Sequence, residues 1–365
     1  MDRVELPHTA IVVAETLLRR VLGTGLQLSI RCSDYSVDLV AGETLSGPME
    51  VGHLHNIYCG CKPLLPLAIA HLIDERLIAV DEPIEHLLGA GNPLVPPWPT
   101  TLNDILCHTA GLTQPVAIVW RMTPVGERAA LIDYSGGTPA AGYSELLGGL
   151  LLEAVIERVT GQDAATLITN RILVPLGLED GIIFDVATRL SLIMPRVRVP
   201  FGGLPDEAIP LLSERMPSQV IDLRPAFGGL ASMSAMSSLY AVLGALYDGV
   251  EHPGLPSAST FRSMIDRRRG VYFDAIMRRD VDFGGGFMRD IGAGGLYDDV
   301  SANSFGHTAG FITNVAFHDP VGDVSLALYV NGIISDARAT RGERNAIVSA
   351  VYRDLRDAHL LQVAQ

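Results

Sequence analysis

The sequence predicts an α+β fold: an antiparallel sheet with strands from both chain ends, flanked by N- and C-terminal helices, with a large, mostly helical insert. Three observations predict it. Strand-like segments stand near both ends, helical patterns lie outside them, and the long middle of the chain has mainly helical spacing. We expect residues 1–64 and 290–365 to form the sheet domain and residues 65–289 the insert.

The N-terminal region is predicted to be a helix followed by a hairpin. Apolar residues recur at helical spacing over residues 9–22, and Gly23 and Gly25 end that helix. Residues 26–32 and 36–41 alternate between apolar and polar side chains, with a short polar turn between them. This alternation is typical of two paired strands with one face in the core.

The middle of the chain contains helices separated by irregular segments. A helix is predicted from about Cys59 to Arg76, and another follows Tyr143 and ends at Gly161. The proline-rich stretch 92–99 predicts a loop. Residues 195–230 are rich in proline and glycine and read as irregular.

The C-terminal region returns to strands and closes with a helix. Residues 311–318 and 324–331 alternate, and Asp319 and Pro320 mark the turn between them. Residues 341–361 are amphipathic at helical spacing. These segments complete the sheet that the N-terminal hairpin begins.

The composition excludes several classes of protein. A chain of 365 residues with 48% hydrophobic and 19% charged side chains is globular and long enough for about two domains. Its net charge of −14 argues against nucleic acid or an anionic membrane as a partner. The run Arg267 to Arg269 is too short to reverse this, and we expect it to be a solvated face.

The sequence also predicts a cytoplasmic, soluble protein. Residues 1–20 contain Glu5 and Glu15 and lack an uninterrupted apolar stretch, so they do not resemble a signal peptide. No apolar run reaches the length of about 18 residues that a membrane span needs. Without an export signal, the cysteines are expected to be reduced thiols: Cys32, Cys59, Cys61 and Cys107.

A single lysine marks the first candidate for chemistry. Lys62 is the only lysine among 27 basic residues, and it stands three positions after Cys59. At the start of a helix this spacing places both side chains on one face, and the helix end and the ammonium both favour a thiolate. Cys59 is therefore a candidate nucleophile, although a buried structural cysteine beside a surface lysine is an equally simple interpretation.

Further motifs follow in a fixed order, and the combination is specific where each motif alone is weak. After Cys59–Lys62 come Asp74–Leu77, Val80–Pro83, Leu106–Leu112, Tyr143–Glu145, Ile156–Gly161, Pro175–Leu178 and Phe305–Gly310. Together they resemble the serine β-lactamase and penicillin-binding-protein superfamily, especially its class C and esterase-like branch. The resemblance spans about residues 10–360 and implies a β-lactamase-like fold.

Three departures from the family pattern bear on function. Cys59 stands where the family has its acylating serine. Glu145 replaces the asparagine of the Tyr-x-Asn motif. The triplet that begins at His307 replaces Lys-Thr-Gly and has Ala309 where the family has glycine, so a Cβ there narrows the acyl pocket or alters the strand.

The resemblance implies a role for each matching residue. Cys59 attacks an acyl carbonyl, Lys62 is its proton acceptor or electrostatic partner, and Tyr143 is the acid and base for leaving group and acceptor. Tyr134 is the rival for the tyrosine position. The oxyanion hole is expected from the backbone N–H groups of Cys59 and Gly310. Substrate contacts are expected from His307, Thr308, Ala309 and Glu145, and no cofactor or metal is implied.

A cysteine in place of serine favours acyl transfer, because a thioester intermediate passes its acyl group readily to amines, alcohols and thiols. We therefore expect an acyltransferase acting through acyl-Cys59, for example in the biosynthesis of antibiotics and other secondary metabolites. Its partners would be an acyl donor and an acceptor. The donor would be a small molecule or a carrier-protein or CoA thioester, and the acceptor a small molecule with an amine or a hydroxyl group. The oligomeric state cannot be read from the sequence.

Three alternatives remain open at this point. The first is a hydrolase of esterase, D-peptidase or β-lactamase type that uses the same site. The second is a metal site built from His53, His55, Cys59 and Cys61, whose ligand types suit zinc. The third is a non-catalytic binding protein that has lost the family's serine. For His307 the plainer interpretation is a structural histidine at a strand end.

Overall fold

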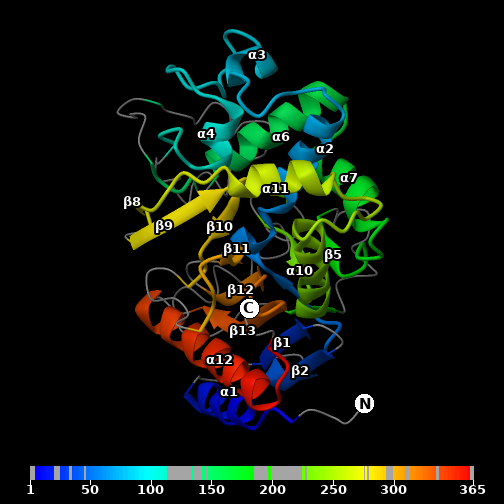
Figure 1. Ribbon diagram of the computed structural model, residues 1–365, viewed down its shortest axis with the longest axis vertical. Helices are drawn as coiled ribbons and strands as arrows, with labels where there is room; N and C mark the ends of the chain where they lie inside the picture. The colour runs from blue at the N-terminus through cyan, green and yellow to red at the C-terminus, as the bar shows by residue number, and fades with distance from the viewer. Residues whose placement is uncertain are drawn as a thin grey trace.

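The computed structural model combines a large antiparallel sheet with helices on both of its faces and a helical region at one end (Figure 1). It describes residues 5–19, 25–32, 35–44, 47–112, 134, 141–144, 146–184, 196–198, 224–226, 228–274, 276–277, 279–292, 299–308, 312–333 and 337–361.

Within the described residues, the main sheet has nine strands in the order β3-β2-β1-β13-β12-β11-β10-β9-β8. The N-terminal hairpin pairs directly with a C-terminal strand, since Leu28 of β1 lies opposite Leu328 of β13. The prediction of an antiparallel sheet with strands from both chain ends is confirmed. The strands are β1 Gly25–Cys32, β2 Tyr35–Thr44, β3 Gly47–Pro48, β8 Tyr272–Asp274, β9 Arg279–Gly284, β10 Phe287–Arg289, β11 Phe305–Thr308, β12 Ile312–Asp319 and β13 Val324–Ile333.

The two terminal helices cover one face of this sheet. Helices α1 (Pro7–Arg19) and α12 (Ala337–Asp357) lie side by side in Figure 1. The carboxylate of Asp354 accepts hydrogen bonds from the N–H groups of His8 (3.0 Å) and Thr9 (2.7 Å) and from the Thr9 hydroxyl (2.7 Å). It thereby satisfies donors at the start of α1, where no helical carbonyl is available.

Strand β1 separates the two faces of the sheet by strict alternation. Leu26, Leu28 and Ile30 belong to the apolar core that also contains side chains of α1 and α12. The intervening Gln27 and Ser29 face the other way, toward α10 (Met233–Tyr247). The side-chain period of two thus decides which helix each residue contacts.

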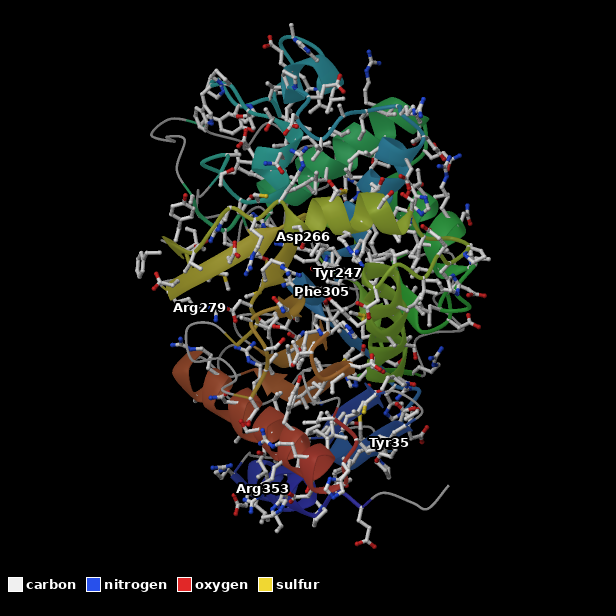
Figure 2. All side chains as sticks on the ribbon, in the orientation of Figure 1. Tyr35, Tyr247, Asp266, Arg279, Phe305 and Arg353 are labelled. Atoms are coloured by element: carbon white, nitrogen blue, oxygen red, sulfur yellow. The ribbon has the colours of Figure 1, made fainter. Side chains whose placement is uncertain are left out.

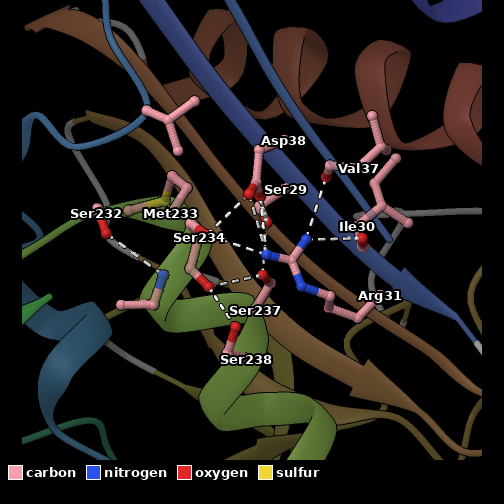
Figure 3. Close-up of polar contacts among 12 residues, drawn as sticks. Ser29, Ile30, Arg31, Val37, Asp38, Ser232, Met233, Ser234, Ser237 and Ser238 are labelled. Carbon is pink, nitrogen blue, oxygen red and sulfur yellow. Dashed lines mark hydrogen bonds and ion pairs between the residues drawn. The ribbon is translucent and has the colours of Figure 1, made fainter. Parts of the chain in front are cut away.

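A polar cluster fastens α10 to the β1–β2 hairpin (Figure 3). The Ser29 hydroxyl lies 2.5 Å from an oxygen of Asp38 and 2.6 Å from the Ser237 hydroxyl. Arg31 donates to Asp38 (2.9 Å) and to Ser234 (3.0 Å). These hydrogen bonds hold the pKa of the Asp38 carboxyl below its usual value, although its partial burial acts in the opposite direction.

The helical region packs at the end of the sheet opposite the terminal helices (Figure 1). Helix α2 (Leu64–Asp74) lies in its centre, since all of its first seven residues are buried. The other elements here are α3 Ile84–Leu88, α4 Leu102–Leu106, α6 Leu147–Thr160, α7 Ala164–Ile168, η3 Thr169–Leu173, α11 Ala258–Asp266 and a small sheet in the order β5 Ile182–Ile183, β7 Leu230–Ala231, β4 Leu54–Asn56 and β6 Val197–Arg198.

Aromatic side chains join the sheet to α10 and α11. The rings of Tyr247 and Phe305 have centroids 5.5 Å apart, and the Tyr247 hydroxyl donates to Asp266 over 2.9 Å. Figure 2 shows these three side chains together in the middle of the molecule. The helical region and the sheet therefore share one continuous apolar core here, which also includes Phe261 and Phe287.

Two expectations need correction. Strands β8, β9 and β10 lie within residues 65–289, yet they extend the main sheet rather than a helical insert. Strands β8 and β10 have only three residues each, which is too short for periodicity to identify; the six-residue β9 was missed although Val281 and Phe283 alternate with aspartates. The helix expected from Cys59 begins as a 3₁₀ turn, η1 Tyr58–Cys61, and becomes α-helical only at Leu64. The division of the chain into domains stays a prediction.

Among the described residues, no helix combines the length and the apolar character that a membrane crossing requires. The 21-residue helix α12 is amphipathic and carries many charged residues.

The Asp354 cap predicts a stability effect. Changing Asp354 to Ala leaves the N–H groups of His8 and Thr9 without their acceptor, and should lower the free energy of unfolding by about 2 kcal/mol in urea titrations. The matched control is Asp357→Ala on the same helix, whose carboxylate is exposed; it should change stability by less than about 0.5 kcal/mol. Equal losses in both variants would contradict the capping role.

Candidate active site

Cys59 lies on a tightly held 3₁₀ turn at the junction of the sheet and α2. Ile57 donates its N–H to Gly229 O (3.0 Å), and its own carbonyl accepts from the Asn314 amide (3.0 Å). Tyr58, directly before Cys59, has a positive φ of 47°, a conformation that non-glycine residues seldom adopt. Strained backbone of this kind is common at functional sites, and here it sets the direction of the Cys59 side chain.

Cys59 is the accessible thiol among the four cysteines, all of which are free. It is half-buried, whereas Cys61, Cys32 and Cys107 are buried. Burial raises the pKa of Cys61 strongly, and it raises the pKa of both Cys32 and Cys107 to about 11. Cys61 donates its thiol to the Tyr58 carbonyl (2.9 Å), so it supports the turn that carries Cys59.

The structure brings Lys62 and Tyr143 together. The Lys62 ammonium donates to the Tyr143 hydroxyl (2.9 Å) and lies 3.5 Å from the Ser144 carbonyl oxygen. It also lies 4.6 Å from the centre of the Tyr143 ring. The backbone N–H of Lys62 donates to the backbone carbonyl of Cys59 (3.1 Å). Because residues three apart are aligned in a 3₁₀ turn, Cys59 and Lys62 lie on the same side of it.

Tyr134, the other candidate for the tyrosine of the site, makes its contacts with a different part of the chain. Tyr134 donates its hydroxyl to Leu94 O over 2.5 Å, and its ring meets the edge of Trp98. Burial raises the pKa of Tyr134 to about 12. The geometry therefore favours Tyr143 as the tyrosine of the site.

Two histidines surround Tyr143. The ring centroids of His108 and His307 lie 4.8 and 5.8 Å from that of Tyr143. Burial, and then the nearby Lys62 charge, hold the pKa of His108 well below its usual range and lower that of His307 to about 3. Both rings are therefore neutral at pH 7, and Lys62 is the positive charge with the largest effect on both.

Hydrogen bonds fix the proton on each neutral ring. His307 Nδ1 lies 2.8 Å from the Thr308 carbonyl, which can only accept, so Nδ1 carries the proton and Nε2 is an acceptor. His307 Nε2 has no hydrogen-bond partner among the described residues. His108 Nδ1 accepts from the Ser144 N–H (3.0 Å), so its proton is on Nε2. The site thus presents one acceptor and one donor nitrogen.

A cavity adjoins these groups. It is narrow, because the space inside it that a water-sized molecule can occupy is only about 20 Å³. Lys62, His108, Ser144 and His307 provide its polar lining. The remaining lining is mainly apolar and comes from Leu65, Pro66, Ile105, Leu106, Leu152 and the glycines 148, 149 and 286. Polar groups of the site thus lie beside a small, mainly apolar space.

Three predicted site residues lie outside the described part of the chain: Glu145, Ala309 and Gly310. The second donor of the oxyanion hole and the two substrate contacts expected from these residues therefore stay predictions. His307 and Thr308 are both buried in β11, and the Thr308 hydroxyl lies 3.9 Å from the sulfur of Met288.

The metal interpretation is not supported by the geometry. No group of three or more potential His, Cys, Asp or Glu ligands is arranged around one point in the described residues. The four candidates have separate surroundings: His53 Nδ1 accepts from the Glu50 N–H, His55 stacks on Tyr329 at 4.0 Å, and Cys61 bonds to a carbonyl.

The expectation of a solvated face at Arg267–Arg269 was wrong for Arg269. Arg267 is exposed and pairs with Asp81, but the side chains of Arg269 and its partner Asp274 are both 0% exposed. Asp274 in turn accepts the Tyr143 N–H (2.7 Å). No sequence signal links Asp274 to Tyr143, because the contact joins residues 131 positions apart.

The sheet with terminal helices on one face, and the lysine–tyrosine pair where it meets the helical region, agree with what the resemblance to the serine β-lactamase superfamily implied. The sequence profile of the Beta-lactamase family matches residues 34–350, and the chain belongs to this family.

Known relatives include hydrolases. Esterase EstB from Burkholderia gladioli is 25% identical over 158 residues, which cover 36% of this chain and 39% of the esterase. A D-amino acid amidase from Ochrobactrum anthropi SV3 has a similar structure, with a TM-score of 0.72 and 17% identity over 97% of this chain and 100% of the amidase. A family VIII carboxylesterase is also similar in structure, with a TM-score of 0.71 and 19% identity over 96% of this chain and 97% of the carboxylesterase.

A penicillin-binding protein homologue from Caulobacter crescentus is also similar, with a TM-score of 0.71 and 21% identity over 94% of this chain and 97% of the homologue. At these identities the structural likenesses show the fold, and the predicted β-lactamase-like fold is confirmed.

The buried His307 predicts a pH dependence of stability. Its folded-state pKa of about 3 lies below the unfolded value of about 6.5, so the unfolded chain binds a proton first. Stability is complete above about pH 6.5 and is lost as the pH falls toward 3. In His307→Gln, the loss of unfolding free energy between pH 7 and pH 5 should be about 2 kcal/mol smaller than in the wild type.

The control for this measurement is His86→Gln, at an exposed position, which should keep the pH dependence of the wild type. An unchanged pH dependence in His307→Gln would contradict the buried, neutral state of His307.

Proposed function

We propose that the protein is an acyl hydrolase of esterase or amidase type that acts through an acyl-Cys59 intermediate. The observation that carries the proposal is the buried hydrogen bond of 2.9 Å between Lys62 and Tyr143. Lys62 directly follows the turn that carries the accessible Cys59. A nucleophile, a cation and a hydroxyl that can exchange protons are the groups that acyl transfer requires. The substrates are small-molecule esters or amides.

In the first step the Cys59 sulfur attacks the carbonyl carbon of the substrate. A C–S bond forms, and the carbonyl oxygen takes the electron pair of its π bond. As the tetrahedral adduct collapses, the bond to the leaving oxygen or nitrogen breaks. The Tyr143 hydroxyl gives its proton to that atom, and its oxygen takes the proton that the Cys59 thiol loses. Lys62, which donates to the Tyr143 oxygen, stabilises the negative charge that develops on this oxygen during the exchange.

In the second step a water molecule attacks the thioester carbon. One water proton passes to the Tyr143 oxygen while the Tyr143 hydroxyl proton passes to the sulfur. The C–S bond breaks, the carboxylic acid leaves, and Cys59 is again a free thiol. His307 Nε2 is an acceptor without a described partner in the cavity wall, which places it to bind a substrate or acceptor hydroxyl.

The relatives support the choice of hydrolysis. Esterase EstB, the carboxylesterase and the D-amino acid amidase carry hydrolase activities in their names. The non-catalytic alternative has no comparable support, because Lys62 and Tyr143 retain a direct contact.

A second candidate is the acyltransferase expected from the sequence, and the observation in its favour is Cys59 itself. A thioester is attacked more readily by amines and thiols than by water, so a cysteine nucleophile suits transfer to an acceptor. On this proposal the donor is an activated ester or a carrier-protein or CoA thioester, and the acceptor is an amine or hydroxyl.

The covalent intermediate can be detected directly. Incubation with a p-nitrophenyl ester should add the mass of one acyl group to the wild type in intact-mass spectrometry, and none to Cys59→Ala. Cys107→Ala is the matched control: its thiol is buried, so the adduct should persist. A wild type without any adduct, together with full activity in Cys59→Ala, would overturn the proposal.

Tyr143→Phe tests the acid–base role. The fold should survive, since only the hydroxyl is removed, and kcat for the same ester should fall by about 10² to 10⁴. A thermal melt is the control for folding. Activity within twofold of the wild type would show that Tyr143 does not handle the proton.

Hydrolysis and transfer are separated by the products. With glycine ethyl ester added, a hydrolase should release the same amount of free acid at an unchanged rate. A transferase should instead form the amide, and nitrophenol release should rise with the amine concentration.

A further inference from the structure

We propose that Asp274, held by Arg269, is a positioning residue for Tyr143. The inference rests on the proposed function, in which Tyr143 moves the proton, and it assigns to the edge strand β8 a part in holding the catalytic hydroxyl in place. Asp274 does not touch the reacting atoms; it acts through the main chain of Tyr143.

The contact to Tyr143 is short and buried. Oδ2 of Asp274 accepts the Tyr143 N–H over 2.7 Å. The other carboxylate oxygen, Oδ1, accepts from the N–H groups of Ile276 and Met277, both at 3.0 Å. With both oxygens bonded to backbone donors on two sides, the carboxylate links the end of β8 to the chain that carries Tyr143.

Arg269 binds this carboxylate and also reaches His108, whose ring packs beside that of Tyr143. Its Nη2 donates to Asp274 Oδ2 (3.2 Å) and to Val281 O (3.0 Å), while Nη1 donates to His108 O (3.3 Å). The guanidinium also lies 4.9 Å from the centre of the Phe283 ring. That ring stacks on Tyr143, with centroids 5.8 Å apart and planes 19° apart.

Side chains thereby hold two consecutive N–H groups of the catalytic segment. Asp274 takes the N–H of Tyr143, and His108 Nδ1 takes that of Ser144 at 3.0 Å. The His108 carbonyl accepts from the Gly142 N–H as well as from Arg269. Tyr143 lies outside helices and strands, so these bonds replace the ladder that would otherwise define its position.

Burying the Arg269–Asp274 ion pair is costly, so a contribution to stability alone does not explain it well. Both side chains are 0% exposed, and apolar residues of similar volume are often as stabilising as a buried ion pair. A carboxylate gives what apolar residues cannot: an acceptor aimed at one chosen N–H. Small displacements of catalytic groups reduce rates strongly, by about 10² for 1 Å.

The chain provides a matched control in the next strand. Asp282 of β9 is also buried and pairs with Arg268, the residue before Arg269, over 2.5 Å. Its described hydrogen bond goes to Arg268 and not to Tyr143. Asp282→Asn therefore breaks a similar pair without touching the catalytic tyrosine.

The test is a double-mutant cycle on the full chain with a p-nitrophenyl ester. Asp274→Asn and Asp282→Asn are each made in the wild type and in Tyr143→Phe, and kcat, KM and melting temperature are measured. We expect Asp274→Asn to lower kcat at least tenfold, with KM within about twofold, because the amide presents donors where the carboxylate accepted. In Tyr143→Phe the same change should have little further effect on kcat.

Two results would overturn the inference: equal kcat values for Asp274→Asn and Asp282→Asn, or the same fold-loss from Asp274→Asn in both backgrounds. If Asp274→Asn does not fold, Arg269→Lys, which keeps the positive charge, is put through the same cycle and judged by the same two results. The proposed function fails separately, when the wild type shows neither turnover nor an acyl-Cys59 adduct.

Discussion

A buried ammonium is the constraint on which the rest of the site depends. Lys62 is 8% exposed, and removing its charge from water is costly unless acceptors are supplied. The Tyr143 hydroxyl and the Ser144 carbonyl supply them, and the Tyr143 ring adds a favourable face. Burial is the main reason why the pKa values of His108 and His307 are lowered, and the Lys62 charge adds to that effect at both rings.

The fold brings these groups together from distant parts of the chain. Lys62 comes from the turn before α2, His307 from β11, and Tyr143 from the segment before α6. The central helix α2 is apolar on nearly all sides, so its position is fixed by packing. The sheet is fixed by register, and the site lies where these two rigid bodies meet.

The sequence predicted the elements that have clear periodicity and the residues that follow a family motif. The N-terminal hairpin, the helix that ends at Gly161 and the C-terminal strands are confirmed. Lys62 and Tyr143 were singled out through their motifs, and the structure places the two side chains in contact, while their roles stay proposals. The Cys59 nucleophile and the preference for transfer stay proposals.

Other features could not be predicted, for physical reasons. Strands β8 and β10, with three residues each, are too short to show alternation, and their place in the sheet was missed together with that of the six-residue β9. The burial of Arg269 was missed for the same reason. In the sequence Arg269 is one of three consecutive arginines, and only its pairing with a buried carboxylate sets it apart from the exposed Arg267. Long-range pairing decides which of three identical side chains enters the core.

The pairing of β1 with β13 has a consequence for biosynthesis. On the ribosome, the hairpin β1–β2 is made well before its partner strand β13, because the whole middle of the sequence lies between them. Until β13 is made, β1 exposes one edge and an apolar face, Leu26, Leu28 and Ile30, which favours binding by chaperones and, without them, aggregation. The sheet is therefore completed only after the middle of the chain has been synthesised, and its long-range contacts predict slow folding.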